Sequence, residues 1–552
     1  MRARARKTFR VGALIAMLAS AALVAGCASA TGTTTTASTP STLTYAINGG
    51  VLSSGKMDIH SSAFQITATV MRNTVDSLVY QTPDGDIVPW LASSWEISPD
   101  GLHYTFTLRN DVTFQDGEPF TAAAVKANFD HVVAPETASA DAASLIGYAA
   151  EGGYYANTEV VDEFTVRVNF VKPYAPFLQA VSTAKLGFYS PKVLETKADQ
   201  LAAGGPGISV GTGPYTMTEY VPNQKIVFQA NPDYNWAPEG SKHEGAATIK
   251  TLVLRILTES SVRTGALTSG EVQVAGSIAA NTVSQIGDGF TIEKIQDPGL
   301  PYSLFLNQKH GVFSDVNVRK AFAEAIDIDR NVTSVYQDQV DRAWSILTPA
   351  TPNAYDPSVE NSLAYDPKDA NALLDAAGWT ARDSDGYRTK DGTRLSVNWI
   401  AWTPVSDANA SFAVAVQADL KKVGFEVIRD DYEVAKFYEL YLARDFDLSD
   451  WSFPSVDADV LRAHLHTDGY KNGSSLSDPA VDKLLDDAVA TADPAEREKL
   501  YQKLQRWNVK NLALIPIYVP TSTTAYSNAV TGLIFDLYGQ PLFYGASLTA
   551  AG

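Results

Sequence analysis

The chain of 552 residues contains a single cysteine, Cys27, and this limits how the rest of the chain can be held together. One thiol can form neither an intrachain disulfide nor a four-thiolate zinc site. The fold must therefore be stabilised by a buried apolar core, and a hydrophobic content of 45% supplies enough material for one. Because the chain is too long for one compact domain, we expect two or three lobes.

The segment before Cys27 is typical of a secretory signal. A positively charged stretch precedes the apolar residues 11–25, a run shorter than the ~20 residues needed to span a bilayer. Residues 23–27, Leu-Val-Ala-Gly-Cys, resemble the lipobox of bacterial lipoproteins, in which the cysteine is acylated and becomes the new N-terminus. We therefore predict a signal peptide over residues 1–26, lipidation of Cys27 and a flexible, threonine-rich tether over residues 27–42.

Acidic residues outnumber basic residues, 62 to 43, which gives a net charge of −19. Removing residues 1–26, whose charged residues are all basic, makes the mature chain more acidic still. A surface of this sign repels nucleic acid and anionic lipid, so we expect no nucleic-acid partner. Attachment to the membrane must then come from the lipid.

The local patterns predict alternating strands and helices. Apolar residues at every second position of 104–108 and 164–170 indicate half-buried strands. Asp-Pro pairs at positions 366, 478 and 493 indicate helix N-termini, because the carboxylate can cap a helix whose first residue is proline. Gly378 and Gly424 indicate helix ends followed by short turns. Without a fixed repeat, this alternation predicts an α/β or α+β body and not a solenoid.

A series of motifs carries a resemblance to a known family. Residues 88–109 and 112–121 are followed in order by Gly-Thr-Gly-Pro-Tyr at 211–215, Asn-Pro-Asp-Tyr at 231–234, Val-Arg-Lys-Ala-Phe-Ala at 318–323 and Leu-Leu-Asp-Ala-Ala-Gly-Trp at 373–379. In their order and spacing they are similar to family 5 of the bacterial extracellular solute-binding proteins, which serve peptide and nickel ABC importers. The resemblance spans approximately residues 43–545.

The resemblance implies an α/β fold of the periplasmic-binding-protein type, class II (cluster C), with three lobes. Lobe I would be discontinuous and comprise residues 43–77, 191–292 and 512–552. Lobe II would comprise residues 78–190, and lobe III residues 293–511. The solute is expected between lobes I and III, since two rigid walls joined by a hinge can close around it.

The implied function is to bind a solute without making or breaking any of its covalent bonds. The chain would be a non-enzymatic monomer without a cofactor, lipid-anchored at the outer face of the cytoplasmic membrane. It would deliver its solute to an ABC permease and ATPase complex. A peptide is the leading solute, with an oligosaccharide, an opine-like solute and chelated nickel as alternatives. A secreted hydrolase and a receptor that serves a sensor are further alternatives, although the sequence contains no His-Glu-x-x-His motif that would support a hydrolase.

One departure from the family pattern concerns the solute's amine. In the family's peptide binders, an aspartate three residues after a tryptophan pairs with the peptide's ammonium group. The matching tryptophan is Trp451, but Pro454 stands at the aspartate's position. A buried ammonium without a partner is strongly destabilised. Either Asp457 provides the pairing, or the solute has no free amine there.

The other candidate binding residues are Phe64, Gln65, Trp402, Phe437, Arg444, Trp451 and Phe453. An arginine near the cleft can bind a carboxylate through two hydrogen bonds, and aromatic rings can enclose side chains, sugars or planar solutes. The competing interpretation is a packed core for the aromatic residues and a solvated charge for the arginine. The seven histidines are scattered, so we predict no metal site.

Overall fold

Three large sheets organise the described part of the chain, and each takes its strands from a different set of segments. The structure is a computed structural model that describes residues 41–139, 141–148, 153–309, 311–403 and 405–549. These residues lie in the unit Thr39–Gly552. The predicted signal peptide, Cys27 and most of the predicted tether fall outside the described residues.

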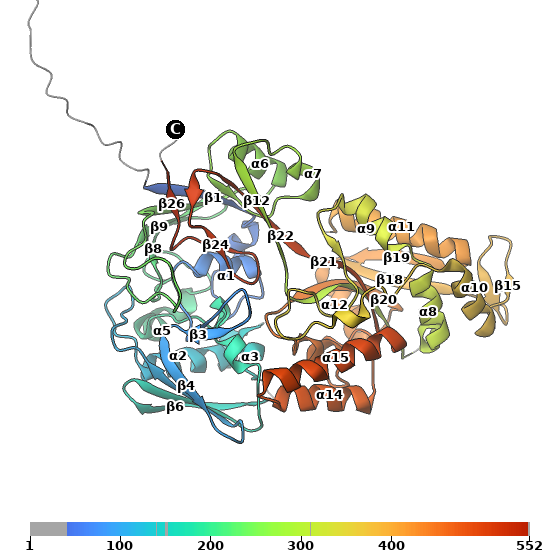
Figure 1. Cartoon of the computed structure of the whole chain (residues 1–552), viewed down its shortest axis with the longest axis horizontal. Helices are drawn as coiled ribbons and strands as arrows, with labels where there is room; N and C mark the ends of the chain where they lie inside the picture. Colours follow the sequence, from blue (N-terminus) through green and yellow to red (C-terminus); the bar gives the residue numbers. More distant parts are fainter. Residues whose placement is uncertain (1–40, 140, 149–152, 310, 404, 550–552) are drawn as a thin grey trace, which may run out of the picture. The chain divides into compact units, whose positions relative to one another are not determined.

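A seven-stranded sheet joins the start, the middle and the end of this unit, so that blue, green and red segments share one sheet (Figure 1). In spatial order its strands are β12 (Phe290–Gln296), β22 (Thr521–Ser527), β11 (Val274–Ala275), β1 (Thr42–Ile47), β10 (Thr251–Ile256), β9 (Lys225–Ala230) and β8 (Tyr215–Val221). β1 pairs in parallel with β10 and β11, and the other pairs are antiparallel. Leu252 and Leu254 of β10 lie in a buried core with Leu43 and Tyr45 of β1.

The predicted strands at 104–108 and 164–170 are confirmed, and they pair with each other in a four-stranded antiparallel sheet. The strands of this sheet are β4 (Ala92–Ile97), β5 (His103–Leu108), β7 (Thr165–Phe170) and β6 (Tyr155–Asp162). Side chains alternate between the two faces of a strand, which brings Tyr104, Phe106 and Leu108 into one core. Helix α2 (Ala122–Val133) contributes Val125 and Phe129 to the same core.

A mixed six-stranded sheet forms the third group. Its strands are β14 (Asp341–Arg342), β21 (Leu514–Val519), β13 (Gly299–Leu306), β20 (Leu448–Pro454), β18 (Ser396–Trp402) and β19 (Glu426–Tyr432). Strands β18, β19 and β20 pair in parallel, and β13 pairs antiparallel with β20 and β21. This sheet is packed with helices that include α8 (Val316–Glu324), α9 (Ile328–Tyr336) and α12 (Val434–Ala443).

The three Asp-Pro pairs begin helices, as predicted. These helices are α10 (Pro367–Ala376), α14 (Pro479–Ala490) and α15 (Pro494–Asn511). The carboxylates of Asp366, Asp478 and Asp493 accept hydrogen bonds from backbone N–H groups of the first turn. Gly424, with a φ of 104°, ends α11 (Asp407–Val423), also as predicted.

The chain passes between the seven-stranded and six-stranded sheets at two connections, residues 297–298 and Pro520. The connections lie side by side, because the backbone N–H of Asp297 donates to the carbonyl oxygen of Pro520 at 2.8 Å. The Ser522 hydroxyl also donates to the Asp297 carboxylate at 3.0 Å. Burial raises the pKa of Asp297 to about 7.

Sheet membership changes later than the expected lobe boundaries at 292/293 and 511/512. β12 stays paired with β22 as far as Gln296, and β21 belongs to the six-stranded sheet as far as Val519. Each ladder then stops next to a proline, Pro298 or Pro520, which has no backbone N–H to donate. The division into three lobes itself stays a prediction.

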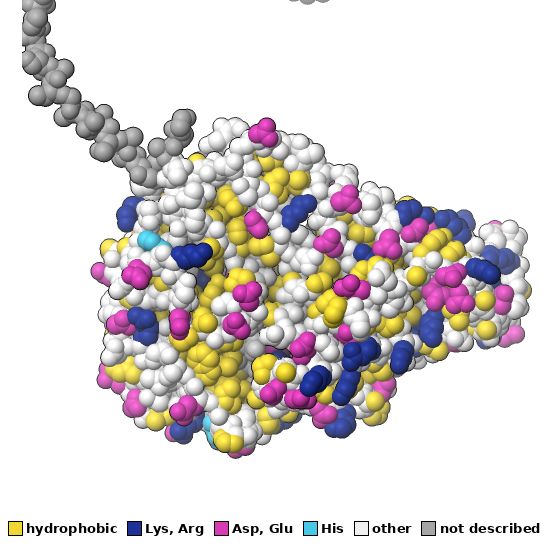
Figure 2. Space-filling model, in the orientation of Figure 1, with side chains coloured by type: hydrophobic (Ala, Val, Ile, Leu, Met, Phe, Trp, Pro, Cys, Tyr) yellow, Lys and Arg dark blue, Asp and Glu magenta, His cyan; other side chains and the backbone are white. Residues whose placement is uncertain are grey.

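Charged side chains of both signs are scattered over the face shown in Figure 2, and Lys and Arg side chains gather over α15. The excess of acidic residues is therefore not evenly distributed on this face. Among the helices of the described residues, none combines the length and the apolar character needed to cross a membrane.

Candidate functional site

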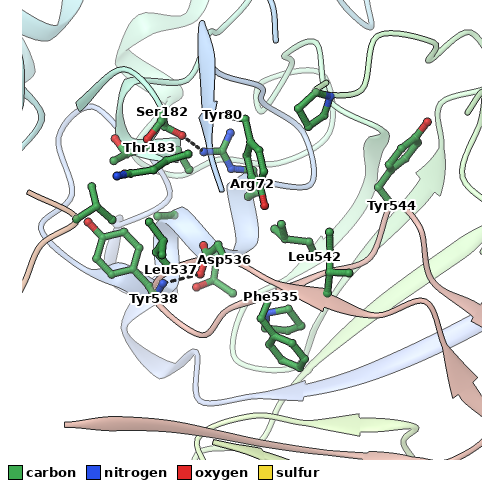
Figure 3. A pocket seen from close by; sticks show the side chains of 18 of the residues that line it. Arg72, Tyr80, Ser182, Thr183, Phe535, Asp536, Leu537, Tyr538, Leu542 and Tyr544 are labelled. Carbon is green, nitrogen blue, oxygen red and sulfur yellow. Dashed lines mark hydrogen bonds between the residues drawn. The ribbon is translucent and has the colours of Figure 1, made fainter. Parts of the chain in front are cut away.

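A cavity of about 900 Å³ is lined by segments that are distant in sequence (Figure 3). The lining includes α1 (Gln65–Met71) with the residue after it, and the hairpin of β24 (Ile534–Phe535) and β25 (Pro541–Leu542). Residues 80–83 and 182–185 also line the cavity. The loop 453–456, which includes the end of β20, contributes from the six-stranded sheet.

Aromatic rings make up much of the cavity wall. Tyr80 packs edge-on against Trp90, with ring centroids 6.0 Å apart, and Tyr234 packs against Tyr544 at 5.0 Å. Tyr538, from the hairpin, adds a further ring (Figure 3). Such walls present flat apolar surface together with hydroxyl groups that can orient a solute.

Arg72 brings a positive charge to the cavity from the residue that follows α1. One guanidinium nitrogen donates to the Ser77 hydroxyl and another to the carbonyl oxygen of Ser182, each at 2.9 Å. The guanidinium carbon lies 5.0 Å from the ring centroid of Trp90. Burial lowers the pKa of Arg72, and no carboxylate of the described residues comes within ion-pair distance of it. Its hydrogen bonds go to neutral groups, while the buried carboxylate of Asp76 and, more weakly, that of Asp536 act on its charge without forming an ion pair.

Asp536 brings a negative charge from the turn between β24 and β25. Its Oδ1 accepts hydrogen bonds from the backbone N–H groups of Tyr538 and Gln540, each at 2.9 Å. Burial raises the pKa of Asp536 to about 6, although these two donors and the charge of Arg72 act in the opposite direction. Figure 3 shows Arg72 and Asp536 in the wall of the same cavity.

The other buried charges at the cavity have partners. Lys185 forms an ion pair with Asp141 at 2.6 Å. Just behind the wall, the ammonium group of Lys471 lies 3.3 Å from the ring centroid of Phe453, and burial lowers the pKa of Lys471 to about 8. Glu239 also lines the cavity, but it is exposed at the rim.

The predicted residues Gln65 and Phe453 both line the cavity. Phe64, just before α1, is 43% exposed and lies outside the lining. Phe437 and Trp451 are buried in a core cluster against which the half-buried Trp402 packs. The ring of Trp402 lies 5.1 Å from that of Phe437 and 5.7 Å from that of Trp451. Apart from Phe64, the predicted aromatic residues thus gather in the region of the six-stranded sheet, most of them beneath the surface.

The two predicted charged residues are engaged within the protein. The carboxylate of Asp457 receives two hydrogen bonds from Arg497, at 2.6 and 2.7 Å, and lies outside the cavity lining. Arg444 follows α12 and donates to the carbonyl oxygen of Tyr441 at 3.2 Å. Whether either residue, or any of the predicted aromatic residues, contacts the solute stays a prediction.

Sequence reasoning missed Arg72 and Asp536. Nothing beside Arg72 distinguishes it from a surface arginine at a helix end. Asp536 stands in the stretch Asp-Leu-Tyr-Gly, which is typical of a turn rather than of a binding site. Only the approach of α1 to the C-terminal hairpin brings the two together. Within the described ranges, no group of three or more His, Cys, Asp or Glu side chains is arranged to hold a metal ion.

Residues 86–472 match the model of the bacterial extracellular solute-binding proteins, family 5 Middle. The nickel-binding periplasmic protein of Escherichia coli (strain K12) is 25% identical over 444 residues, which cover 78% of this chain and 80% of the relative. The dipeptide-binding protein of Pseudomonas aeruginosa is 27% identical over 483 residues, which cover 83% of this chain and 86% of the relative.

The crystal structure of NikA from Brucella suis in complex with Fe(III)-EDTA is similar to the present structure, with a TM-score of 0.79 and 28% identity. The match covers 92% of this chain and 100% of that chain. It confirms the predicted α/β fold of the periplasmic-binding class II type. These matches are to binding proteins and not to enzymes.

Proposed function

The chain belongs to family 5 of the bacterial extracellular solute-binding proteins. We propose that it captures a peptide in the cavity beside Arg72 and Asp536 and delivers the peptide to an ABC permease. The family and the relatives bind solutes outside the cytoplasm and are not enzymes. The permease and its ATPase are the proposed partners, and the chain would meet them as a monomer.

The observation that carries the proposal is the cavity with walls from two different sheets. The loop 453–456 continues from β20 of the six-stranded sheet, whereas Arg72 and the C-terminal hairpin belong to the part of the chain built around the seven-stranded sheet. A solute in this cavity would contact both parts at once. It would therefore stabilise the arrangement in which they are close, and a permease could recognise that arrangement.

A peptide suits the lining. The volume falls within the range of about 300–1,000 Å³ that is common for ligand sites. Aromatic walls can hold side chains of many kinds, and buried charges of both signs can hold the charged termini. One relative is named a dipeptide-binding protein.

A carboxylate-rich metal chelate is the second candidate, because Arg72 is a buried cation with no carboxylate partner in the described structure. One relative is named a nickel-binding protein, and the similar crystal structure contains Fe(III)-EDTA. Native mass spectrometry of the purified chain separates the candidates. A co-purified mass that fragments as a peptide is expected, whereas a metal-containing mass would favour the chelate. Conversion of the guest into products would contradict both.

We further propose that Cys27 carries the lipid that holds the protein at the outer face of the cytoplasmic membrane. The lipobox-like sequence before it supports this. Replacing the thiol by a hydroxyl removes the acylation site, so Cys27→Ser is expected to move the protein from the membrane fraction to the soluble fraction. Ala30→Ser, a small change in the tether that leaves the acylation site intact, is the matched control and should stay in the membrane fraction. Cys27→Ser protein that stays with the membrane would contradict lipid anchoring at this residue.

A further inference from the structure

The partner of the solute's amine is missing at the position where the family's peptide binders have it. Pro454 lines the cavity but carries no charge. Asp457 is occupied by Arg497 through two hydrogen bonds, and only 12% of its side chain is exposed. A solute with a free amine would therefore need another carboxylate in the same cavity.

Three carboxylates line this cavity among the described residues: Asp141, Glu239 and Asp536. Asp141 is paired with Lys185 at 2.6 Å, and both side chains are largely buried. Glu239 is exposed at the rim, where water screens its charge. Asp536 is the remaining carboxylate that is both desolvated and without an ion-pair partner in the described structure.

The turn that holds Asp536 fixes one side of its carboxylate. Oδ1 accepts two backbone hydrogen bonds, whereas Oδ2 accepts none from the described residues. A carboxylate oxygen can accept more than one hydrogen bond, and a charged donor gives the strongest ones. Asp536 can therefore bind an ammonium group without breaking its turn.

Arg72 provides the opposite charge in the lining of the same cavity. Two of its hydrogen bonds go to neutral oxygens, those of Ser77 and Ser182, and the guanidinium has five N–H donors in all. Asp76, which is buried and lies outside the cavity lining, and Asp536 both act electrostatically on Arg72, but neither forms an ion pair with it. Two opposite, desolvated charges that do not neutralise each other favour a ligand that carries one charge of each sign.

We propose that the cavity selects a zwitterionic solute, with Asp536 binding its ammonium group and Arg72 binding its carboxylate. This inference rests on the proposed function and deepens it. The required chemistry is shared by free amino acids, dipeptides and longer peptides. The distance that the solute must span between Asp536 and Arg72 decides which of them fits.

Equilibrium dialysis with mass spectrometry can test the proposal on the full-length chain purified in detergent. The probes are amino acids and synthetic pools of dipeptides and of tetrapeptides, each with free termini, with an acetylated amine or with an amidated carboxylate. For at least one length, wild-type protein is expected to bind the free form at least about tenfold more tightly than either blocked form, which is about 1.4 kcal/mol.

Asp536→Asn separates charge from shape, because the amide oxygen can still accept the two backbone hydrogen bonds of the turn. In this variant the free and acetylated forms should bind within about twofold of each other, while the effect of amidation persists. Arg72→Lys should reduce the discrimination against the amidated form, since lysine lacks the planar fork. Asp233→Asn, which removes an exposed carboxylate outside the cavity lining, is the matched control and should behave as wild type.

Each readout is a ratio measured on one protein sample, so a fraction of unfolded protein does not change it. Asp536→Asn with the wild-type ratio of free to acetylated binding would overturn the proposal. Wild-type protein that binds none of the probes but co-purifies with another solute would also overturn the proposed zwitterion selectivity. The proposed function of solute capture would still stand in that case. Wild-type protein that neither binds a pool nor co-purifies with any solute would contradict the proposed function itself.

Discussion

At the scale of single residues, burial decides whether a charge is available to a solute. Arg497 of α15 is buried against the loop that follows β20, and Asp457 neutralises it at 2.6 Å. Tyr501 also contacts this arginine, at 3.0 Å from its hydroxyl. Asp457 therefore has a structural partner, whatever else it binds.

Asp457→Ala should lower the free energy of unfolding by about 3–5 kcal/mol, because it removes the ion-pair partner of the buried charge of Arg497. Urea denaturation followed by tryptophan fluorescence measures the change. Asp487→Ala breaks the exposed ion pair with Lys483 and should cost less than about 1 kcal/mol. If folded Asp457→Ala protein binds the natural solute with unchanged affinity, Asp457 does not hold the solute.

A buried pair of histidines gives a second prediction at this scale. His60 Nε2 lies 3.0 Å from the carbonyl oxygen of Gly187, to which it must donate, so neutral His60 can only accept at Nδ1. His131 Nδ1 lies 3.0 Å from that atom and is then the donor. Burial lowers the pKa of His60 to about 4, although nearby Asp58 acts in the opposite direction.

Because the folded pKa of His60 lies below its unfolded value of about 6.5, His60 stabilises the fold fully above pH 6.5. This contribution is lost as the pH falls from about 6.5 towards 4. The melting temperature of wild-type protein minus that of His60→Gln should therefore decrease over this range. Carboxylates that titrate in both proteins cancel in the difference. A difference that stays constant from about pH 7 to about pH 4.5 would contradict the assignment.

At the scale of elements, two glycines differ in whether their position requires a left-handed backbone conformation. Gly424 ends α11 with a φ of +104°, and a Cβ there would lie 2.6 Å from the Cγ of Arg388. Gly265 lies inside α6 (Ser260–Thr268), and a Cβ there would meet nothing within 4 Å. The same substitution should therefore have opposite effects at the two positions.

Gly424→Ala should destabilise the protein by more than about 1 kcal/mol, because alanine tolerates neither the left-handed backbone nor the contact. Gly265→Ala should stabilise it by about 0.5–1 kcal/mol, since alanine loses less conformational entropy in a helix. Denaturant midpoints of the two variants measure both effects. Equal shifts of the same sign would show that backbone conformation is not the cause.

At the scale of the whole molecule, two adjacent connections carry the chain between its large sheets. Residues 297–298 and Pro520 are linked by one backbone hydrogen bond of 2.8 Å. Two short connections restrict relative motion to bending about a line through them. A solute that contacts both sides of the cavity should then change the distance between the sheets.

Spin labels at Val262, which is 50% exposed on α6, and Val414, which is 65% exposed on α11, can report this distance in a Cys27→Ser background. Added solute should narrow the distance distribution to one population. The pair Val414 and Leu442, both in the region of the six-stranded sheet, serves as the control and should not respond. An unchanged distribution for the first pair, at saturating solute, would contradict closure about the two connections.

The local structure and the family could both be predicted from patterns along the chain. Strands β5 and β7, the capped starts of α10, α14 and α15, and the end of α11 follow from residues adjacent in the chain. Their signals are alternation, an Asp-Pro pair and a glycine, and each acts over a few residues. Ordered motifs along the chain were likewise enough to identify the family and, through it, the fold.

Which charges face the cavity depends on how segments that are distant in sequence pack together. Trp451 and Phe453 are two residues apart, yet one lies in the core and the other in the cavity wall. Arg72 and Asp536 are separated by most of the chain and meet because α1 and the C-terminal hairpin pack in the same region. Desolvation and pairing depend on every group around a charge, and most of those groups are remote in sequence. This is why local patterns could predict the helices but not the site.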